Sequence, residues 1–132
     1  TFEEARGCEL RRDGLHPLAD FQWSGSDRTG RAETTNSPLR RKRGMHTFAA
    51  TLGTDRVPHI YIDGKRQPIV ISWSGSPTHF AGLPSNTARS SNYIGKSNWV
   101  DDQPFEGFIQ YIRIYDYELS PQTVLADARS HY

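Results

Sequence analysis

One stretch near the C-terminal end, residues 104–121, constrains the fold of this chain more than any other part of it. Alternate positions share one face of an extended chain, and here one face is mostly apolar: Phe108, Gln110, Ile112 and Ile114. This period of two predicts a long β-strand that begins near Gly107 and ends at Asp116. A short helix should follow, because Ser120 is a suitable N-cap and Pro121 suits the first helical position.

The rest of the chain contains shorter strand candidates, at residues 7–14, 19–23, 45–52, 59–65, 68–73 and 93–95. A further strand around residues 28–34 is weakly marked. Asp13-Gly14 and Asp63-Gly64 are strong signals for tight hairpin turns. Eleven glycines and eight prolines agree with a turn-rich chain, and only the C-terminal tail has a helical pattern. The sequence therefore predicts one all-β domain, an antiparallel β-sandwich with a short C-terminal helix.

Charge, hydropathy and cysteine content exclude several classes of protein. Sixteen basic and fifteen acidic residues leave a net charge of +1, which gives no field that would attract nucleic acid or anionic lipid. No apolar run approaches the roughly 20 residues of a membrane-spanning helix. A single cysteine, Cys8, rules out an internal disulfide framework. The chain begins at Thr1 without an initiator methionine or a visible signal peptide, so we expect it to be processed or a fragment.

Three pieces of the sequence resemble one known family, in order and in spacing. His46-Thr47-Phe48-Ala49-Ala50-Thr51 resembles a strand of the pattern Trp-x-His-Val-Ala-x-Thr, and Tyr61-Ile62-Asp63-Gly64 resembles a Leu-Tyr-Val-Asp-Gly hairpin. Tyr93-Ile94-Gly95, Phe105-x-Gly107-x-Ile109 and Arg113-Ile114-Tyr115-x-x-x-Leu119-Ser120 resemble the closing strands. The family is the laminin G-like, concanavalin A-like lectin/glucanase family. The resemblance is close over residues 45–127 and loose over residues 7–44.

The resemblance implies a concanavalin A-like jelly roll that occupies residues 1–132 as a single domain. Members of the family have further strands before the equivalent of residue 7, so we expect the chain to be a C-terminal portion of such a domain. Gln110 stands where the family commonly has Asp, and Asp116 where Asn is common. The family favours an extracellular or cell-surface location, with an organellar or intracellular complex as the alternative.

Catalysis is not expected. Glucanases of this fold carry a Glu-x-Asp-x-x-Glu strand that places paired carboxylates on one face, and the sequence contains no such triplet. The nearest pair at a strand end, Asp116 and Glu118, lies where side chains usually face solvent. The five histidines lack the spacing of zinc ligands. Cys8 resembles a small core residue more than a reactive thiol.

Carbohydrate binding is the favoured function, because aromatic side chains beside amides and hydroxyls can stack a sugar ring and bond its edges. Trp99 is the first candidate, since it follows Asn98 in a polar loop, and Trp73 at a strand exit is the second. The alternative for each tryptophan is packing in the core.

A calcium ion is the cofactor that the family implies, bound by oxygen atoms of loops. Asn92, Asp101 and Asp102 are the candidate ligands, because hard cations prefer carboxylate and amide oxygens, and Asn98 lies in the same loop. Alternatively, these residues only terminate turns in a polar loop.

One basic cluster stands out: Arg40, Arg41, Lys42 and Arg43. It is either a solvated loop, a patch for an acidic partner, or a dibasic cleavage site in a secreted protein. These observations favour a non-catalytic binding module for a glycan or glycosylated surface. The alternative is a structural, assembly or adhesion domain that contacts other proteins, with the basic cluster and the tyrosines Tyr61, Tyr111 and Tyr115 buried in the complex.

Overall fold

The computed structural model describes residues 6–13, 16–23, 30–35, 45–83, 94, 100 and 108–130, and these form two antiparallel sheets and one helix. Sheet A has the strand order β1-β2-β3-β7, and its strands are β1 (Arg6–Asp13), β2 (His16–Trp23), β3 (Gly30–Thr34) and β7 (Ile69–Ser72). Sheet B has the order β4-β5-β6, and its strands are β4 (Phe48–Leu52), β5 (Pro58–Ile62) and β6 (Lys65–Arg66). The all-β prediction with antiparallel sheets is confirmed, including the weakly marked strand at β3.

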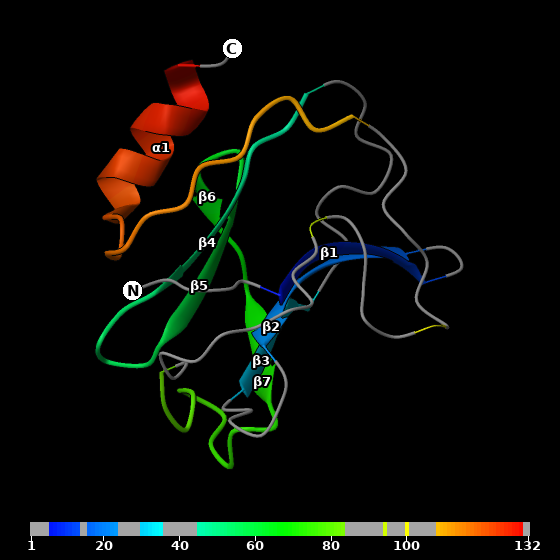
Figure 1. Ribbon diagram of the computed structural model, residues 1–132, viewed down its shortest axis with the longest axis vertical. Helices are drawn as coiled ribbons and strands as arrows, with labels where there is room; N and C mark the ends of the chain where they lie inside the picture. Colours follow the sequence, from blue (N-terminus) through cyan, green and yellow to red (C-terminus); the bar gives the residue numbers. More distant parts are fainter. Residues whose placement is uncertain are drawn as a thin grey trace.

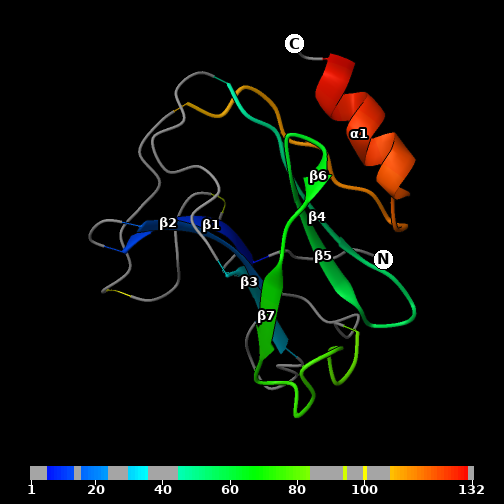
Figure 2. The ribbon, with the colours of Figure 1, turned by 180° about the vertical axis from the view of Figure 1, so that it is seen from behind.

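The chain passes from sheet B to sheet A between β6 and β7. Two hydrogen bonds fasten this crossing, from the Gln67 N–H to the Ile60 carbonyl at 2.8 Å and from the Thr35 N–H to the Pro68 carbonyl at 3.1 Å. Figures 1 and 2 show the result: β1 and β2 extend away from helix α1 (Pro121–Ser130), which lies beyond sheet B.

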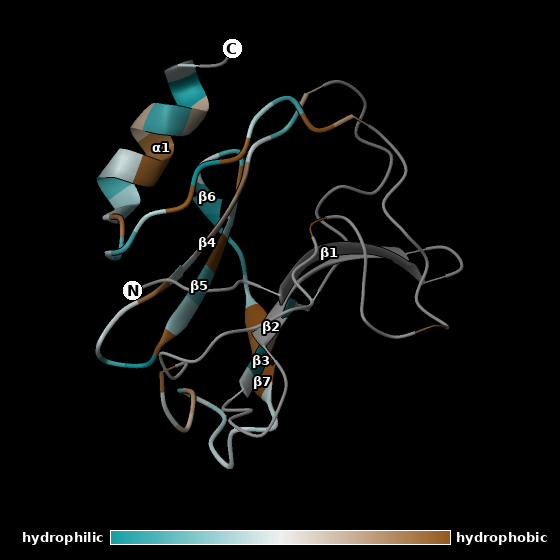
Figure 3. Cartoon of the chain, viewed as in Figure 1, coloured by the Kyte–Doolittle hydropathy of each residue, from teal (hydrophilic) through white to brown (hydrophobic). Residues whose placement is uncertain are grey.

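An apolar core joins the two sheets. Its fully buried members come from β3, β5 and the segment after β7: Ala32, Ile60, Ile62 and Phe80. Half-buried side chains from β4 and β7 pack around them: Phe48, Ala50, Leu52, Ile69 and Ile71. These positions alternate along each strand, as expected where one face of a strand turns inward, and Figure 3 shows the apolar colour on these strands and along one side of α1. The Phe80 ring occupies the space that any side chain at position 30 would need, so Gly30 is required for close approach.

The hairpin predicted at Asp63-Gly64 is confirmed. Asp63 has a φ of 53° and Gly64 a φ of 79°, the backbone that a two-residue turn between right-twisted strands requires. The turn joins β5 to β6, with Ile62 paired to Lys65. Helix α1 packs on this turn, since a Cβ atom at Gly64 would lie 3.0 Å from Leu125 Cα.

The prediction of a long strand over residues 107–115 is wrong for the residues that the structure describes. Residues 108–115 belong to neither sheet, and Gly107 lies outside the described residues. Phe108 is 95% exposed, Ile114 is 69% exposed and Ile112 is 52% exposed, so most of the apolar face found in the sequence lies at the surface of the described structure. Alternation signals the tendency of a segment to form a strand, but a strand also needs a partner edge.

The predicted C-terminal helix is confirmed, with its start as expected. The Ser120 side-chain oxygen accepts a hydrogen bond from the Thr123 N–H at 3.1 Å, and Pro121 occupies the first helical position. Val124 and Ala128 are the buried positions of the helix. Among the described residues, no helix is long and apolar enough to cross a lipid bilayer.

Candidate functional site

The candidate site is the segment of residues 73–79, called here the Trp73 loop, which begins where β7 ends. Trp73 leaves the strand with a φ of 64°, a left-handed conformation that is rare for a large side chain, and its surface is 42% exposed. Gly75 also has a positive φ, of 75°, and a Cβ atom there would meet nothing within 4 Å. The turn therefore bends into open space.

A cation on the neighbouring strand holds the indole of Trp73. Arg31 on β3 lies opposite Ser72 in the pairing of β3 with β7, and its guanidinium carbon is 5.3 Å from the centre of the Trp73 ring. Such a cation–π contact is worth about 0.5–1 kcal/mol at an exposed site. Arg31 also pairs with Glu33, two residues along the same face of β3, with 3.1 Å between Nη2 and Oε2. The aromatic face is thus fixed from the sheet.

Hydroxyl groups and an imidazole form a connected network in the rest of the loop. The Ser76 hydroxyl lies 3.2 Å from the Thr78 hydroxyl, and both lie 3.0 Å from Nδ1 of His79. The Ser74 hydroxyl donates to the Ser76 carbonyl at 2.6 Å and accepts from the Ser76 N–H at 3.1 Å. These short bonds shape the loop locally, as Ser and Thr side chains often do in turns.

The far end of the loop is anchored in the core. Phe80 is fully buried, and its N–H donates to the Arg56 carbonyl at 2.8 Å. The Arg56 guanidinium in turn donates to the Ala81 carbonyl at 3.0 Å. Sheet A holds one end and the core holds the other, so an exposed aromatic ring and several hydrogen-bonding groups lie on a defined scaffold. This combination can stack a sugar ring and bond its hydroxyls.

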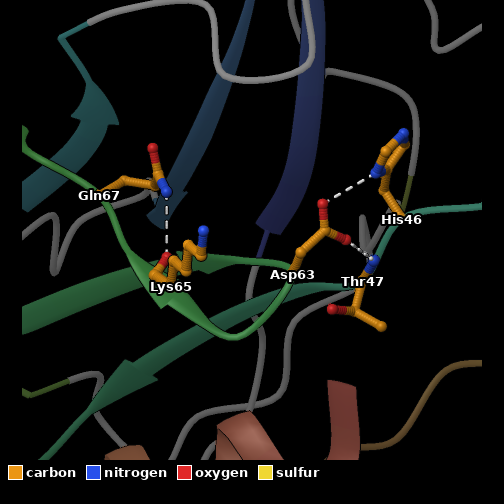
Figure 4. Close-up of polar contacts among 5 residues, drawn as sticks. All are labelled: His46, Thr47, Asp63, Lys65 and Gln67. Atoms are coloured by element: carbon orange, nitrogen blue, oxygen red, sulfur yellow. Dashed lines mark hydrogen bonds and ion pairs between the residues drawn. The ribbon is translucent and has the colours of Figure 1, made fainter. Parts of the chain in front are cut away.

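A second polar cluster, at the β5–β6 hairpin, is structural (Figure 4). Asp63 Oδ2 lies 2.9 Å from Nδ1 of His46, and Oδ1 accepts the Thr47 N–H at 3.0 Å. The Asp63 N–H donates to the Thr47 carbonyl at 2.9 Å, and the Gln67 side chain donates to the Lys65 carbonyl at 3.0 Å. The Asp63 carboxylate therefore ties the entry to β4 to the turn after β5.

Ionisable groups also gather on the outer face of sheet B. Burial raises the pKa of Glu118, the negative charge of Asp55 adds to the rise, and Arg66 opposes it. Burial lowers the pKa of His59, followed by the effect of Arg66, whose Nε donates to Nδ1 of His59 at 3.1 Å. The Glu118 carboxylate lies against Gly53, while Asp116 is exposed. The described contacts include no hydrogen bond between the side chains of Asp116 and Glu118.

The structure places only one of the predicted sugar-binding residues, Trp73, and it puts this residue at the surface. The other predicted site residues lie outside the described residues, so their roles stay predictions: Asn98, Trp99, Asn92, Asp101, Asp102, Arg40, Arg41, Lys42 and Arg43. In the part of the chain that the structure describes, no three His, Cys, Asp or Glu side chains gather as a metal site would require.

Sequence reasoning missed Arg31, Glu33, Ser76, Thr78 and His79. The polar composition of residues 74–79 was the available signal for three of them. No local signal marks Arg31, because its place beside Trp73 depends on the register of β3 against β7.

The family model for the concanavalin A-like lectin/glucanases superfamily, of the laminin G type, matches residues 3–125. The chain belongs to this superfamily. The match includes both sheets, the Trp73 loop and the first turn of α1, and it confirms the family resemblance found in the sequence. No curated protein and no solved structure matches the chain. The description of the superfamily names both lectins and glucanases, so it is consistent with a binding module and leaves the ligand open.

Proposed function

We propose that this superfamily member is a non-catalytic recognition module that binds carbohydrate through the Trp73 loop, within a jelly-roll sandwich. The observation that carries the proposal is the partly exposed indole of Trp73, which contacts Arg31 and begins a loop that also carries the hydroxyls of Ser76 and Thr78. Sugar sites combine an apolar ring face with a few placed polar groups in this way. The scaffold fixes the ring before a ligand arrives, which lowers the entropy cost of binding.

Two features support binding without hydrolysis. Retaining glycosidases need two carboxyl groups about 5–5.5 Å apart across the scissile bond, and inverting ones need about 6.5–9.5 Å. The sequence has no Glu-x-Asp-x-x-Glu strand. In the described contacts around Trp73, the Glu33 carboxylate is paired with Arg31, the residue whose guanidinium contacts the Trp73 ring. One ion-paired carboxylate does not supply both an acid and a base.

Glycan-array screening followed by calorimetry tests the proposal. We expect the chain to bind at least one glycan, and Trp73→Ala to weaken that binding at least tenfold, because it removes the stacking surface. Tyr117→Ala is the matched control: it removes another exposed aromatic side chain that is not part of the Trp73 loop, and it should leave affinity unchanged. Circular dichroism confirms that both variants fold. A folded chain that binds no glycan, or a Trp73→Ala variant of unchanged affinity, would overturn the proposal.

A second candidate is an assembly subunit that contacts other proteins, favoured by the exposed apolar side chains of residues 108–117. Among them are Phe108, Ile114 and Tyr117. The prediction that Tyr61 is buried by such a partner is wrong, because Tyr61 is already buried within the chain itself, at 2% exposure. Sedimentation separates the candidates, because a monomer that binds sugar fits the first and an oligomer without sugar binding fits the second.

A further inference from the structure

One edge of sheet A has free backbone groups. Strand β7 is the last strand of this sheet and pairs with β3 on one side (Figure 2). Hydrogen-bonded and non-hydrogen-bonded positions alternate along an antiparallel pair. The Thr35 N–H donates to the Pro68 carbonyl, so Pro68 and every second residue after it are bonded to β3. The N–H and C=O groups of Ile69 and Ile71 therefore point away from β3, and in the described part of the chain they have no hydrogen bond on that side.

The other sheet edges carry charged groups, which commonly prevent pairing with another chain. Charged residues recur along β1, with the sequence Arg-Gly-Cys-Glu-Leu-Arg-Arg-Asp, and both residues of β6 are charged. At the end of β4, the Glu118 carboxylate lies against Gly53. Strand β7 reads Ile-Val-Ile-Ser and contains neither a charge nor a proline, and its Val70 is 49% exposed. Its edge thus lacks the protection that the other edges have.

The edge of β7 is complementary to itself. When two copies lie antiparallel with Val70 opposite Val70 of the second copy, Ile69 of each copy lies opposite Ile71 of the other. The outward N–H and C=O groups of both isoleucines then all find partners across the joint. Ile69 and Ile71 pack against the core, so they meet their counterparts on the inner face, while the two valines meet on the outer face. Apolar β-branched pairs of this kind are favourable, and no like charges face each other within the four residues.

We propose that β7 is the interface to a second copy of this chain, and that it joins two copies of sheet A into one continuous antiparallel sheet about a two-fold axis. Such a contact uses the same edge on both copies, so assembly stops at the dimer. Because β7 has only four residues, the dimer is reversible and depends on protein concentration. The inference does not depend on sugar binding, since a dimer that binds sugar would simply carry two Trp73 loops.

Sedimentation velocity across about three decades of protein concentration tests the dimer. We expect the unmodified chain to change from monomer to dimer as the concentration rises. Val70→Glu should weaken dimerisation about tenfold or more, because it places like charges opposite each other across the axis, beside Glu33 on β3. Ile112→Glu is the matched control: it changes another exposed apolar residue, in a segment outside both sheets, and should leave the dimer intact. Circular dichroism confirms that both variants fold.

A cysteine at the axis tests the register, and it decides the matter even if Val70→Glu does not fold. The Cα atoms of a non-hydrogen-bonded antiparallel pair lie about 4.5 Å apart, which is within the range of a disulfide. In a Cys8→Ser background, Val70→Cys should therefore form disulfide-linked dimers in a glutathione redox buffer. Ile112→Cys in the same background should form far fewer.

A monomer at every concentration would overturn the inference, and so would growth beyond the dimer or full dimerisation of folded Val70→Glu. Loss of the dimer in Ile112→Glu alone, or preferential cross-linking of Ile112→Cys, would place the contact at residues 108–117 and also overturn it. A dimer that binds no glycan leaves this inference standing and removes the proposed function. A monomer that binds a glycan through Trp73 does the reverse.

Discussion

Two turns in this molecule each contain a non-glycine residue and a glycine with positive φ, but their surroundings are opposite. At Asp63-Gly64 and at Trp73–Gly75, a non-glycine residue with positive φ precedes a glycine with positive φ. Around Gly64, helix α1 is so close that an added Cβ atom would meet Leu125 and Ala128, whereas around Gly75 it would meet nothing within 4 Å. The comparison shows that a left-handed turn does not by itself mark a functional site. The covering of a turn decides whether it packs against the rest of the fold or stays open at the surface.

The side chains at the two turns also differ: that of Asp63 is bonded within the fold, and that of Trp73 is partly exposed. Asp63 directs its carboxylate inward, to His46 and Thr47, and so serves the fold (Figure 4). Trp73 keeps two fifths of its surface exposed, at 42%, and contacts Arg31 on the neighbouring strand. Changes at the covered turn should therefore alter stability, and changes at the open turn should alter binding.

The strongest test of this separation is Phe80→Ala, because Phe80 belongs to the core and also ends the Trp73 loop. Removal of a fully buried phenylalanine should lower the free energy of unfolding by about 3–5 kcal/mol. Leu83→Ala, a nearby but exposed apolar change, should cost less than about 0.5 kcal/mol. Urea denaturation measures both. Sugar affinity should fall in Phe80→Ala as well, and full affinity with reduced stability would show that the loop does not depend on its core anchor.

A matched pair of glycine substitutions sharpens the comparison. Gly64→Ala combines a positive φ with contacts of 2.8 Å to Leu125 Cδ1 and 3.0 Å to its Cα, so we expect a loss of about 1–3 kcal/mol. Gly75→Ala has the same backbone cost but an open environment, and should lose about 1 kcal/mol or less. Thermal unfolding of the two variants side by side measures the difference. Equal losses would mean that α1 does not press on the hairpin turn.

The smallest expected effect is a pH dependence of stability that arises from Glu118, whose carboxylate lies against Gly53. Because the pKa of Glu118 is raised above its usual value of 4.5, the folded state favours the neutral acid. Its contribution to stability is therefore fully present below pH 4.5 and is lost as the pH rises through the raised pKa. Glu118→Gln should raise the melting temperature slightly at pH 7 and not at pH 4, since the side chain is exposed and water screens it.

Asp116→Asn is the control, because it removes a neighbouring exposed acid. Differential scanning fluorimetry at the two pH values follows both variants. An equal shift of the melting temperature at pH 4 and pH 7 for Glu118→Gln would contradict the raised pKa of Glu118.

Local chemistry explains which parts of the fold the sequence predicted. The hairpin at Asp63-Gly64 and the cap at Ser120 were found because both depend on neighbours in the chain, a turn that needs positive φ and a side chain that reaches an N–H three residues on. The strand at residues 107–115 was wrong because alternation does not reveal whether a partner edge is present. Trp73 was found as an aromatic residue at a strand exit, whereas Arg31 and Glu33 were missed because the register of distant strands brings them there.

If the Trp73 loop binds a sugar as proposed, the contact between Arg31 and Trp73 also affects the rates of binding and release. Because the indole is already in place, capture of a sugar would need no slow rearrangement, and encounters would set the forward rate. The few groups at the loop would then release the sugar readily. Firm attachment to a surface would come from many such sites engaged at once, through avidity and not through one long-lived contact.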